Sequence, residues 1–437
     1  MQEAKYSINH VVRLLFKTSS INVASRIFGY LRTFSIAILL GFSLDTDAVF
    51  LALSIIGLFI LFSESFDTVG VSKLVRLFEQ DKEKFKIFAT NLFALIILLS
   101  ITNVFFGMIL VSILPYVRFI PKEISTYEPF KLSMFIFSLY SALNFIFTFF
   151  GSLTRIRKHF VLYFFAEFVF YFFNFVLTTL GLMYIKSYVI IPISFLISLF
   201  LATLILMLKN LSYLDFSDLS LNYIKKELKY ILNDFISISS AYGAFYLYTL
   251  VDKFFAIHVG EKALSALNYG FLLATSVWNI LRFERIAIIN LAENLQNYKA
   301  FTILLKNYIK MLILISIPFS IIFYALPYYI VKLLFGYGAF SLEDILLTSE
   351  ALKYYSFSLP FTILWPLVFR AMIVSNLRRA VFVLSIFTIL LNIITNYIFV
   401  FMLSLGIKGI CIATFISYVV LVGGGLSVII VNGRKGK

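Results

Sequence analysis

The chain contains about twelve apolar stretches that are each long enough to cross a bilayer, separated by short polar gaps. A membrane-spanning helix needs about 20 predominantly apolar residues. Backbone groups inside a bilayer must be hydrogen-bonded within the protein, so stretches of this length are expected to be helical. The sequence therefore predicts an all-α, polytopic membrane protein. The predicted spans cover residues 19–42, 47–72, 87–114, 130–153, 160–184, 188–208, 231–257, 264–291, 307–326, 354–376, 380–403 and 408–432.

The composition excludes several other classes of protein. Hydrophobic residues make up 61% of the 437 residues and charged residues only 14%, which is far from an ordinary soluble domain. The formal net charge is +15, but the basic residues are spread over short loops, so we expect no nucleic-acid partner. A single cysteine, Cys411, and three scattered histidines support neither a disulfide, a metal site nor a catalytic centre. We therefore expect a protein that is not an enzyme and binds no metal.

The basic residues also predict an orientation. Every second gap is rich in Lys and Arg, as at 73–86, 155–158 and 225–229, whereas the gaps between them hold few. Cytoplasmic loops of membrane proteins carry an excess of positive residues. The alternation persists along the whole chain, and it predicts that both termini are cytoplasmic.

The spans divide into two sets of six. The predicted domains are an N-terminal bundle at 1–218 and a C-terminal bundle at 219–437, and the polar segment 209–230 is the linker. Its residues 209–218 belong to the first domain and 219–230 to the second. Both halves begin and end on the same side, so the two repeats are parallel. This architecture places a substrate site between two bundles, near the middle of the membrane.

Arg26 and Arg32 lie inside the first apolar span. An arginine near the bilayer centre costs roughly 2.5–3.5 kcal/mol, and such residues almost always face a bundle interior or a wet cavity. Gly29, between them, leaves space on the same ridge of the helix. A guanidinium matches the geometry of phosphate and keeps its charge when dehydrated. The pattern predicts a cavity that binds a phosphorylated anion, although both arginines would also be stable if they paired with carboxylates such as Glu64 or Glu167.

Other charged residues in or beside the spans allow two interpretations each. Asp47, at the tight turn where the second predicted span begins, is expected to cap a helix or to act in gating. Lys253 beside Asp252 is interpreted as a local charge-compensated pair. Arg282 and Arg285 share a helix face, where they bind lipid headgroups or form a phosphate gate.

Three polar residues offer a candidate cation site. Asp234 lies in the seventh predicted span, and Asn392 and Asn396 lie one helical turn apart in the eleventh. Carboxylate and carboxamide oxygens are suitable ligands for a small, hard coupling cation such as sodium. Hydrogen bonding between helices is the alternative. No other cofactor is expected.

Three stretches carry a family resemblance. They are SRIFGYLRTFSIAILLGFSLDTDAVFLA at 25–52, YTLVDKFFAIHVGEKALSALNYGFLL at 248–273, and IVKLLFGYGAFSLEDILLTSEALKYYSFSLPF at 330–361. Together they resemble the MurJ/MviN-type lipid II flippase branch of the multidrug/oligosaccharidyl-lipid/polysaccharide exporter superfamily. The third stretch, with its LLF-x-x-GAF pattern, is the most specific.

The resemblance implies two six-helix bundles of the superfamily type in the cytoplasmic (inner) membrane of a bacterium. It implies alternating access, with a polyprenyl-pyrophosphate-linked saccharide such as lipid II moved from the inner to the outer leaflet for cell-wall or surface-polysaccharide synthesis. A monomer suffices for this mechanism, and membrane lipids are the other expected partners. The alternatives are an O-antigen or capsule repeat-unit flippase, a drug/cation antiporter of the same superfamily, and a membrane polysaccharide polymerase or ligase.

The resemblance also assigns residues. Arg26, Arg32 and Asp47 match family positions important for function, Glu64 matches an acidic residue at the end of the second helix, and Arg370 matches an arginine of the tenth. The substrate-binding candidates are therefore Arg26, Gly29, Arg32, Arg282, Arg285 and Arg370, and the gating candidates are Asp47 and Glu64. The chain departs from the family pattern at Thr33, where an aspartate is usual, at Phe59 and Ile60, where arginines are usual, and at Leu272, where an arginine is expected. Flippases of this branch have two further C-terminal helices beyond the twelve predicted here.

Overall fold

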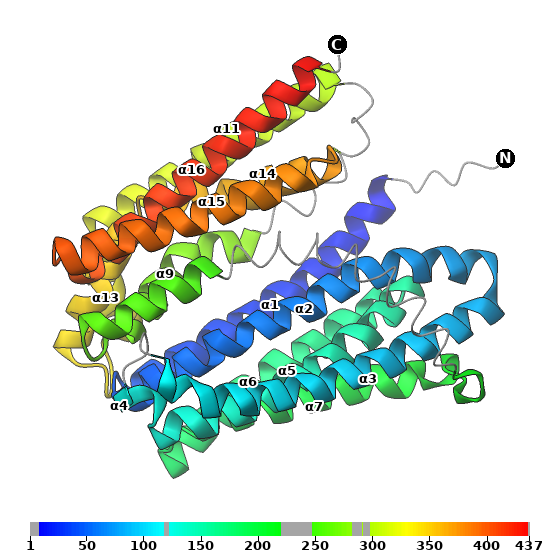
Figure 1. The fold of residues 1–437 in the computed structure, drawn as a ribbon, viewed down its shortest axis with the longest axis horizontal. Helices are drawn as coiled ribbons and strands as arrows, with labels where there is room; N and C mark the ends of the chain where they lie inside the picture. Colours follow the sequence, from blue (N-terminus) through cyan, green and yellow to red (C-terminus); the bar gives the residue numbers. More distant parts are fainter. Residues whose placement is uncertain (1–7, 118–121, 220–246, 282–290, 292–297, 436–437) are drawn as a thin grey trace. The chain divides into compact units, whose positions relative to one another are not determined.

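The computed structural model describes residues 8–117, 122–219, 247–281, 291 and 298–435. Every regular element within these ranges is helical (Figure 1). The helices form two compact units. One unit comprises Met1–Leu39, Phe62–Ile113 and Lys131–Phe235, and the other comprises Leu40–Leu61, Leu114–Phe130 and Ile236–Lys437. The first half of the second long helix thus belongs to the same unit as the C-terminal part of the chain.

The first unit is built from long helices that pack through aromatic side chains. Phe28 of α1 contacts the rings of Phe168, Phe172 and Phe175 of α6 at centroid distances of 5.7, 5.2 and 5.7 Å, and α6 packs along α7. α1 contains no proline and runs unbroken from Ile8 to Leu40. The helices that contribute to this unit are α1 (Ile8–Leu40), α2 (Leu44–Gln80), α3 (Lys82–Ile113), α5 (Glu128–Ile156), α6 (Phe160–Ile185) and α7 (Ile190–Asn210), with the short turns η2 (Leu211–Tyr213) and η3 (Phe216–Asp218).

The second unit contains the start of α2 and most of the C-terminal part of the chain. α13 packs on α9, and both α14 and α15 pack on α16. Residues 247–259 form a further helix that carries two of the charged residues discussed below. The named elements are η1 (Leu114–Tyr116), α4 (Lys122–Ser125), α9 (Ala263–Leu281), α11 (Tyr298–Ala325), α12 (Pro327–Phe335), α13 (Leu342–Tyr355), α14 (Leu359–Val374), α15 (Arg378–Tyr397), the π-helical turn η4 (Ile398–Met402) and α16 (Gly406–Lys435).

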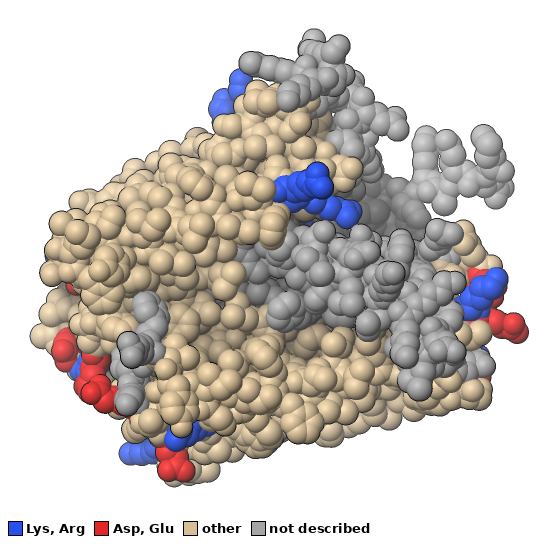
Figure 2. Space-filling model, viewed as in Figure 1, with Lys and Arg blue, Asp and Glu red and all other residues tan. Residues whose placement is uncertain are grey.

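The helices have the properties of membrane spans. Eight helices in the described ranges are long and apolar enough to cross a bilayer, and nine are if α13 and α14 count as one bent span. Large apolar side chains such as Phe105 and Leu314 stay exposed on their helices, as expected for contact with lipid. The face shown in Figure 2 is correspondingly dominated by uncharged side chains, with a few small groups of charges. The prediction of an all-α polytopic membrane protein is confirmed.

The segment 327–353, between the ninth and tenth predicted spans, is largely helical. It contains α12 and α13, and α13 joins α14 across a short break with a bend of 54°. Ser341 begins α13 because its side chain and that of Asp344 form a reciprocal capping box. Pro360 lies in the first turn of α14, where the missing N–H costs no helical hydrogen bond.

Two predictions about the organisation of the chain, the domain boundary and the side of the membrane that holds the termini, stay predictions. The division into domains at 218 falls beside residues 220–246, which lie outside the described ranges. The cytoplasmic placement of both termini depends on the positive-inside rule alone.

Candidate functional site

Two aromatic side chains hold the arginines of α1. Arg26 Nη1 donates to Tyr171 Oη of α6 at 2.8 Å, and its guanidinium carbon lies 5.2 Å from the centroid of the same ring. The guanidinium of Arg32 lies 4.5 Å from the ring centroid of Phe195 on α7, and its Nη2 donates to Thr33 Oγ1 at 3.3 Å. Both arginines are half-buried. Cation–π contact at these distances stabilises a charge without neutralising it.

Arg26 has no carboxylate within ion-pair distance among the residues described. The candidate partner on α6, Glu167, instead accepts a hydrogen bond from Tyr163 Oη at 3.0 Å. Arg26 Nε is buried and has no hydrogen-bond partner in the described part of the chain. Because a guanidinium carries five donors, Arg26 retains donors for a further acceptor such as a phosphate oxygen.

Gly29 has a different role from the predicted one. An ideal Cβ built at Gly29 would lie 3.2 Å from Cδ1 of Tyr171. The space beside Gly29 is therefore filled by this ring, which approaches α1 closely and brings its hydroxyl to Arg26. Tyr171 was not predicted from the sequence, because one of 26 tyrosines in an aromatic-rich chain carries no distinguishing signal.

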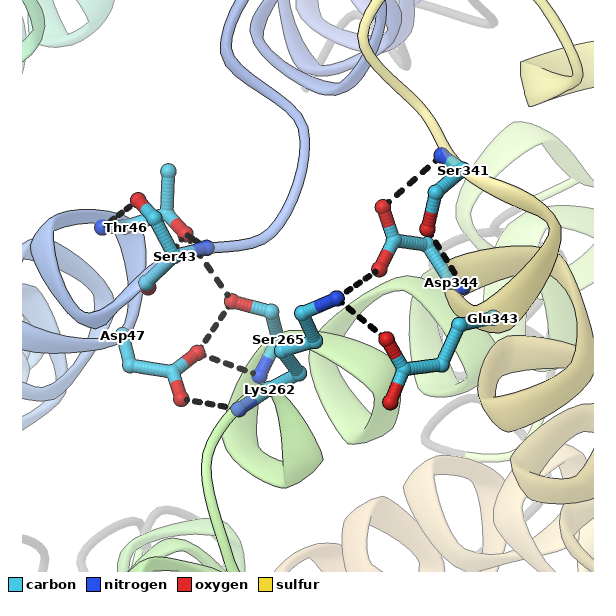
Figure 3. A network of polar contacts seen from close by, with 8 residues as sticks. All are labelled: Ser43, Thr46, Asp47, Lys262, Ser265, Ser341, Glu343 and Asp344. Carbon is cyan, nitrogen blue, oxygen red and sulfur yellow. Dashed lines mark hydrogen bonds and ion pairs between the residues drawn. The ribbon is translucent and has the colours of Figure 1, made fainter.

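A second polar cluster surrounds the start of α2, and we call it the turn cluster (Figure 3). Ser43 and Thr46 cap α2 reciprocally: Thr46 N donates to Ser43 Oγ at 3.3 Å, and Ser43 N donates to Thr46 Oγ1 at 2.9 Å. These two side chains accept hydrogen bonds from backbone N–H groups at the start of α2. The carboxylate of Asp47 is therefore available to another helix. The turn cluster comprises Ser43, Thr46, Asp47, Lys262, Ser265, Ser341, Glu343 and Asp344.

Asp47 caps α9 rather than its own helix. Its Oδ1 accepts hydrogen bonds from Ser265 N, at 2.9 Å, and from Ser265 Oγ, while its Oδ2 accepts one from Lys262 N at 3.0 Å. α9 begins at Ala263, so these N–H groups lie at the helix start and have no acceptor within the helix. A negative charge is also favourable at a helix N-terminus. The capping interpretation of Asp47 thus applies to α9, and its gating role stays a prediction.

Lys262 extends the turn cluster to a third helix. Its Nζ lies 2.5 Å from Glu343 Oε2 and 3.2 Å from Asp344 Oδ1, both in the first turn of α13. The hydrogen bond with Glu343 raises the pKa of Lys262, which lies in a polar turn outside the predicted spans. The N-termini of α2, α9 and α13 are therefore joined by one continuous set of polar contacts.

Apolar contacts reinforce the turn cluster. Gly41 has a φ of +65°, and an ideal Cβ there would lie 2.5 Å from the carbonyl oxygen of Ala339. The ring of Phe42 packs edge-to-face on Phe340 at 4.8 Å and stacks on Tyr269 at 5.3 Å. The Ala and Phe of the LLF-x-x-GAF pattern thus form the surface against which the α1–α2 turn packs, which gives that pattern a physical reason.

A third polar cluster is buried in the second unit. Asp252 Oδ1 accepts hydrogen bonds from Asn396 Nδ2 at 2.9 Å and Asn392 Nδ2 at 3.3 Å, and Thr414 Oγ1 donates to Asp252 Oδ2. The four side chains are at most 5% exposed. They come from the helix at 247–259, α15 and α16. Their carboxylate, carboxamide and hydroxyl oxygens are the kind of ligands that hard cations prefer.

This cluster adds to two interpretations. Asp234, which was predicted to join the two asparagines, lies outside the described residues, and the described carboxylate that contacts the asparagines is that of Asp252. Lys253 interacts electrostatically with Asp252, as expected. Its Nζ also donates to Ser54 Oγ of α2. The contacts of Asp252 with Asn396 and of Lys253 with Ser54 join distant parts of the chain, so neither could be predicted from the sequence.

The remaining predicted residues are placed less completely. Arg370 lies in α14 and is half-buried. Glu64 lies in α2, but its side chain is outside the described part of the structure. Arg282 and Arg285 are also outside the described residues. Their proposed roles stay predictions.

The same fold occurs in solved structures of membrane proteins. The chain is similar to a solved structure of the lipid II flippase MurJ in an inward closed conformation, with a TM-score of 0.77 and 22% identity over 95% of this chain and 87% of the other. It is also similar to an inward-facing multidrug resistance MATE family transporter of the MOP superfamily, with a TM-score of 0.76 and 15% identity over 94% and 96% of the two chains. The chain therefore has the fold that these two multi-pass membrane proteins share.

Sequence comparison then gives the family. The model of the family "Lipid II flippase MurJ" matches residues 36–430, and the chain belongs to this family. A probable lipid II flippase MurJ of Aquifex aeolicus is 25% identical over 409 residues, which cover 90% of this chain and 78% of the relative. A second, from Thermotoga maritima, is 35% identical over 115 residues, and this match spans only 26% of this chain and 24% of the relative. Family membership and the apolar helices identify a multi-pass inner-membrane protein and confirm the predicted resemblance.

Proposed function

We propose that this protein moves a polyprenyl-pyrophosphate-linked saccharide from the inner to the outer leaflet, and that lipid II is its substrate. Membership of the MurJ family supports the choice of lipid II. The observation that carries the proposal is the state of Arg26, which donates to Tyr171 and has no described carboxylate within ion-pair distance. A guanidinium in this state suits a pyrophosphate that has left water.

The α1 residues also argue against a drug/cation antiporter of the same superfamily. A cavity that binds cations needs carboxylates, and the membrane-embedded part of α1 carries Arg26 and Arg32 but no acidic residue. A polymerase or ligase would need catalytic side chains in a long loop. The family is one of flippases, so the proposed activity is transport across the membrane. It involves no covalent step.

The turn cluster is the proposed gate of an alternating-access cycle. Asp47 and Lys262 hold the N-termini of α2, α9 and α13 together. These three helix starts separate only if the hydrogen bonds to Asp47 and the ion pairs of Lys262 break. By the positive-inside prediction this end faces the outer side, so an intact turn cluster corresponds to a closed outer gate.

The buried cluster around Asp252 is the proposed site for a coupling cation, sodium or a proton. Asn392 and Asn396 were predicted for this role, and their contact with Asp252 supplies the carboxylate that such a site needs. Thr414 adds a hydroxyl oxygen. The hydrogen-bond donors to this buried carboxylate are all neutral. A buried carboxylate is costly in a membrane, so a site of this kind gains from binding a cation.

Complementation tests the proposed substrate. Cells depleted of their essential lipid II flippase are supplied with this protein or with its Arg26→Ala variant at equal membrane levels. Rescue by the wild-type protein and failure of the variant support the proposal. Failure of the wild-type protein, with its presence in the membrane verified, would contradict lipid II and favour an O-antigen or capsule repeat unit as the substrate.

A further inference from the structure

The two arginines of α1 rest on one continuous aromatic cluster within the first unit. Arg26 contacts the ring of Tyr171, and Arg32 contacts the ring of Phe195. The ring of Phe170 contacts both of these rings, at centroid distances of 5.0 Å from Tyr171 and 6.2 Å from Phe195. The three rings belong to α6 and α7, which pack along each other. The two guanidinium groups are therefore held by a single set of packed rings.

The ring of Phe195 is fixed by its neighbours. It is only 7% exposed, and Phe137 and Tyr140 of α5 meet it edge-to-face at centroid distances of 5.6 and 5.4 Å. Tyr140 also stacks on Phe170 at 6.3 Å. Edge-to-face and stacked pairs at these distances are favourable. A ring that is packed on several sides keeps one position, so it defines where the guanidinium of Arg32 lies.

The contact with Phe195 orients Arg32 without using individual N–H groups. The guanidinium carbon of Arg32 lies over the ring, 4.5 Å from the centroid. A ring face attracts the cation as a whole, whereas the N–H donors of a guanidinium lie in its own plane. The attraction is stronger for desolvated groups, and this ring is buried. A long side chain that is already anchored also loses less rotamer freedom when it binds a ligand.

We propose that Phe195 is a positioning residue, whose ring holds the guanidinium of Arg32 in the orientation that binds a phosphate oxygen of the lipid-linked pyrophosphate. This inference rests on the proposed function, and it names a residue that acts through Arg32 and not on the substrate directly. The competing role for Phe195 is packing alone. Packing depends on the shape of the ring, whereas positioning of a cation depends on the negative charge of the ring face.

Fluorinated phenylalanines at position 195 separate the two roles. Each fluorine weakens the negative face of the ring, while the ring keeps nearly the same shape. The affinity for a polyprenyl pyrophosphate is measured with purified full-length protein that carries mono-, di- or trifluorophenylalanine in place of Phe195. We expect the affinity to fall stepwise, by about 2- to 30-fold for the trifluorinated ring, which is the range that one cation–π contact allows.

The matched control is the same series at Phe137, whose ring contacts are with Tyr140 and Phe195 and not with an arginine. The affinity is expected to stay constant in this series. An unchanged affinity in the series at Phe195, or an equal fall in the series at Phe137, would show that Phe195 only packs the core.

The same assay distinguishes failure of the inference from failure of the proposed function. If the wild-type protein binds the pyrophosphate lipid no better than the matching monophosphate lipid, and Arg26→Gln and Arg32→Gln change nothing, the proposed function itself fails. Should the fluorinated proteins not fold, Phe195→Leu is compared with Phe137→Leu. Both variants lose a ring, but only Phe195→Leu loses the contact with Arg32, so it is expected to bind the pyrophosphate at least about twofold more weakly than Phe137→Leu. Equal affinities of these two variants would contradict the inference.

Discussion

The carboxylate of Asp47, in the first turn of α2, accepts a hydrogen bond at 2.9 Å from the backbone N–H of Ser265, in the first turn of α9. The two residues are 218 positions apart in the sequence. A helix start is usually capped by its own preceding residue. Here the cap of α9 comes from a helix of the N-terminal half, so α9 is fully capped only while the two helices stay together. A local capping interaction has thereby become a long-range contact.

Asp47→Ala is expected to destabilise the protein and to impair transport. The substitution leaves the N–H groups of Lys262 and Ser265 without their acceptor, which predicts a loss of about 1–3 kcal/mol in the free energy of unfolding. Thermal unfolding of the purified protein measures this loss. Asp45→Ala is the matched control, because Asp45 accepts a hydrogen bond from the hydroxyl of Tyr127 at 2.6 Å and does not cap α9. An equal loss in both variants would contradict the assigned role of Asp47.

Gly41→Ala is expected to disturb the packing of the α1–α2 turn. The new Cβ meets the carbonyl oxygen of Ala339, and the left-handed backbone alone costs about 1–2 kcal/mol for a residue other than glycine. Gly57→Ala serves as the control, since a Cβ at Gly57 in α2 meets nothing within 4 Å. That variant should gain about 0.5–1 kcal/mol from helix propensity. Unfolding temperatures that fall equally for both variants would contradict this account.

Tyr171→Phe is expected to lower transport without unfolding the protein. The ring over Gly29 remains, but Arg26 loses its acceptor, and one neutral hydrogen bond corresponds to about a 2- to 12-fold change in rate or affinity. Tyr163→Phe is the control on the same helix, because the Tyr163 hydroxyl donates to Glu167 and not to Arg26. Flipping by reconstituted protein is the measurement. A rate for Tyr171→Phe equal to that of the wild type would show that the tyrosine hydroxyl does not position Arg26.

The cluster around Asp252 predicts stabilisation by sodium. A cation that binds the folded state alone raises the unfolding temperature as its concentration rises. Wild-type protein should therefore unfold at a higher temperature in sodium chloride than in choline chloride of equal ionic strength, and Asn396→Ala should lose this difference. The absence of a sodium-specific shift in the wild-type protein would rule out sodium and leave the proton as the candidate.

The spans could be predicted because burial in lipid imposes a single requirement, length with few charges, on every one of them. Arg26 and Arg32 stood out for the same reason, since a charge in an apolar span is rare. The capping box that begins α13, Ser341 followed three residues later by Asp344, was not singled out from the sequence. A capping role was predicted for Asp47, but the sequence did not indicate that the capped helix is α9.

Contacts between distant helices were not predictable. The ring of Tyr171 fills the space beside Gly29. Asn396 donates to Asp252, a residue that was not predicted to join the two asparagines. Both outcomes depend on how helices rotate against each other, and one sequence contains no pairing information for that rotation. The prediction that Asn392 and Asn396 lie on one face of a helix was correct, because it depends only on their spacing along that helix.

Flipping of lipid II by purified protein in proteoliposomes tests the central claim most directly. The fraction of lipid II that becomes accessible in the opposite leaflet is measured for the wild-type protein, Arg26→Gln, Arg32→Gln and empty vesicles. The account predicts rapid exchange by the wild-type protein and rates near those of empty vesicles for both variants. Exchange by either variant at the wild-type rate would contradict the claim that the arginines of α1 bind the pyrophosphate.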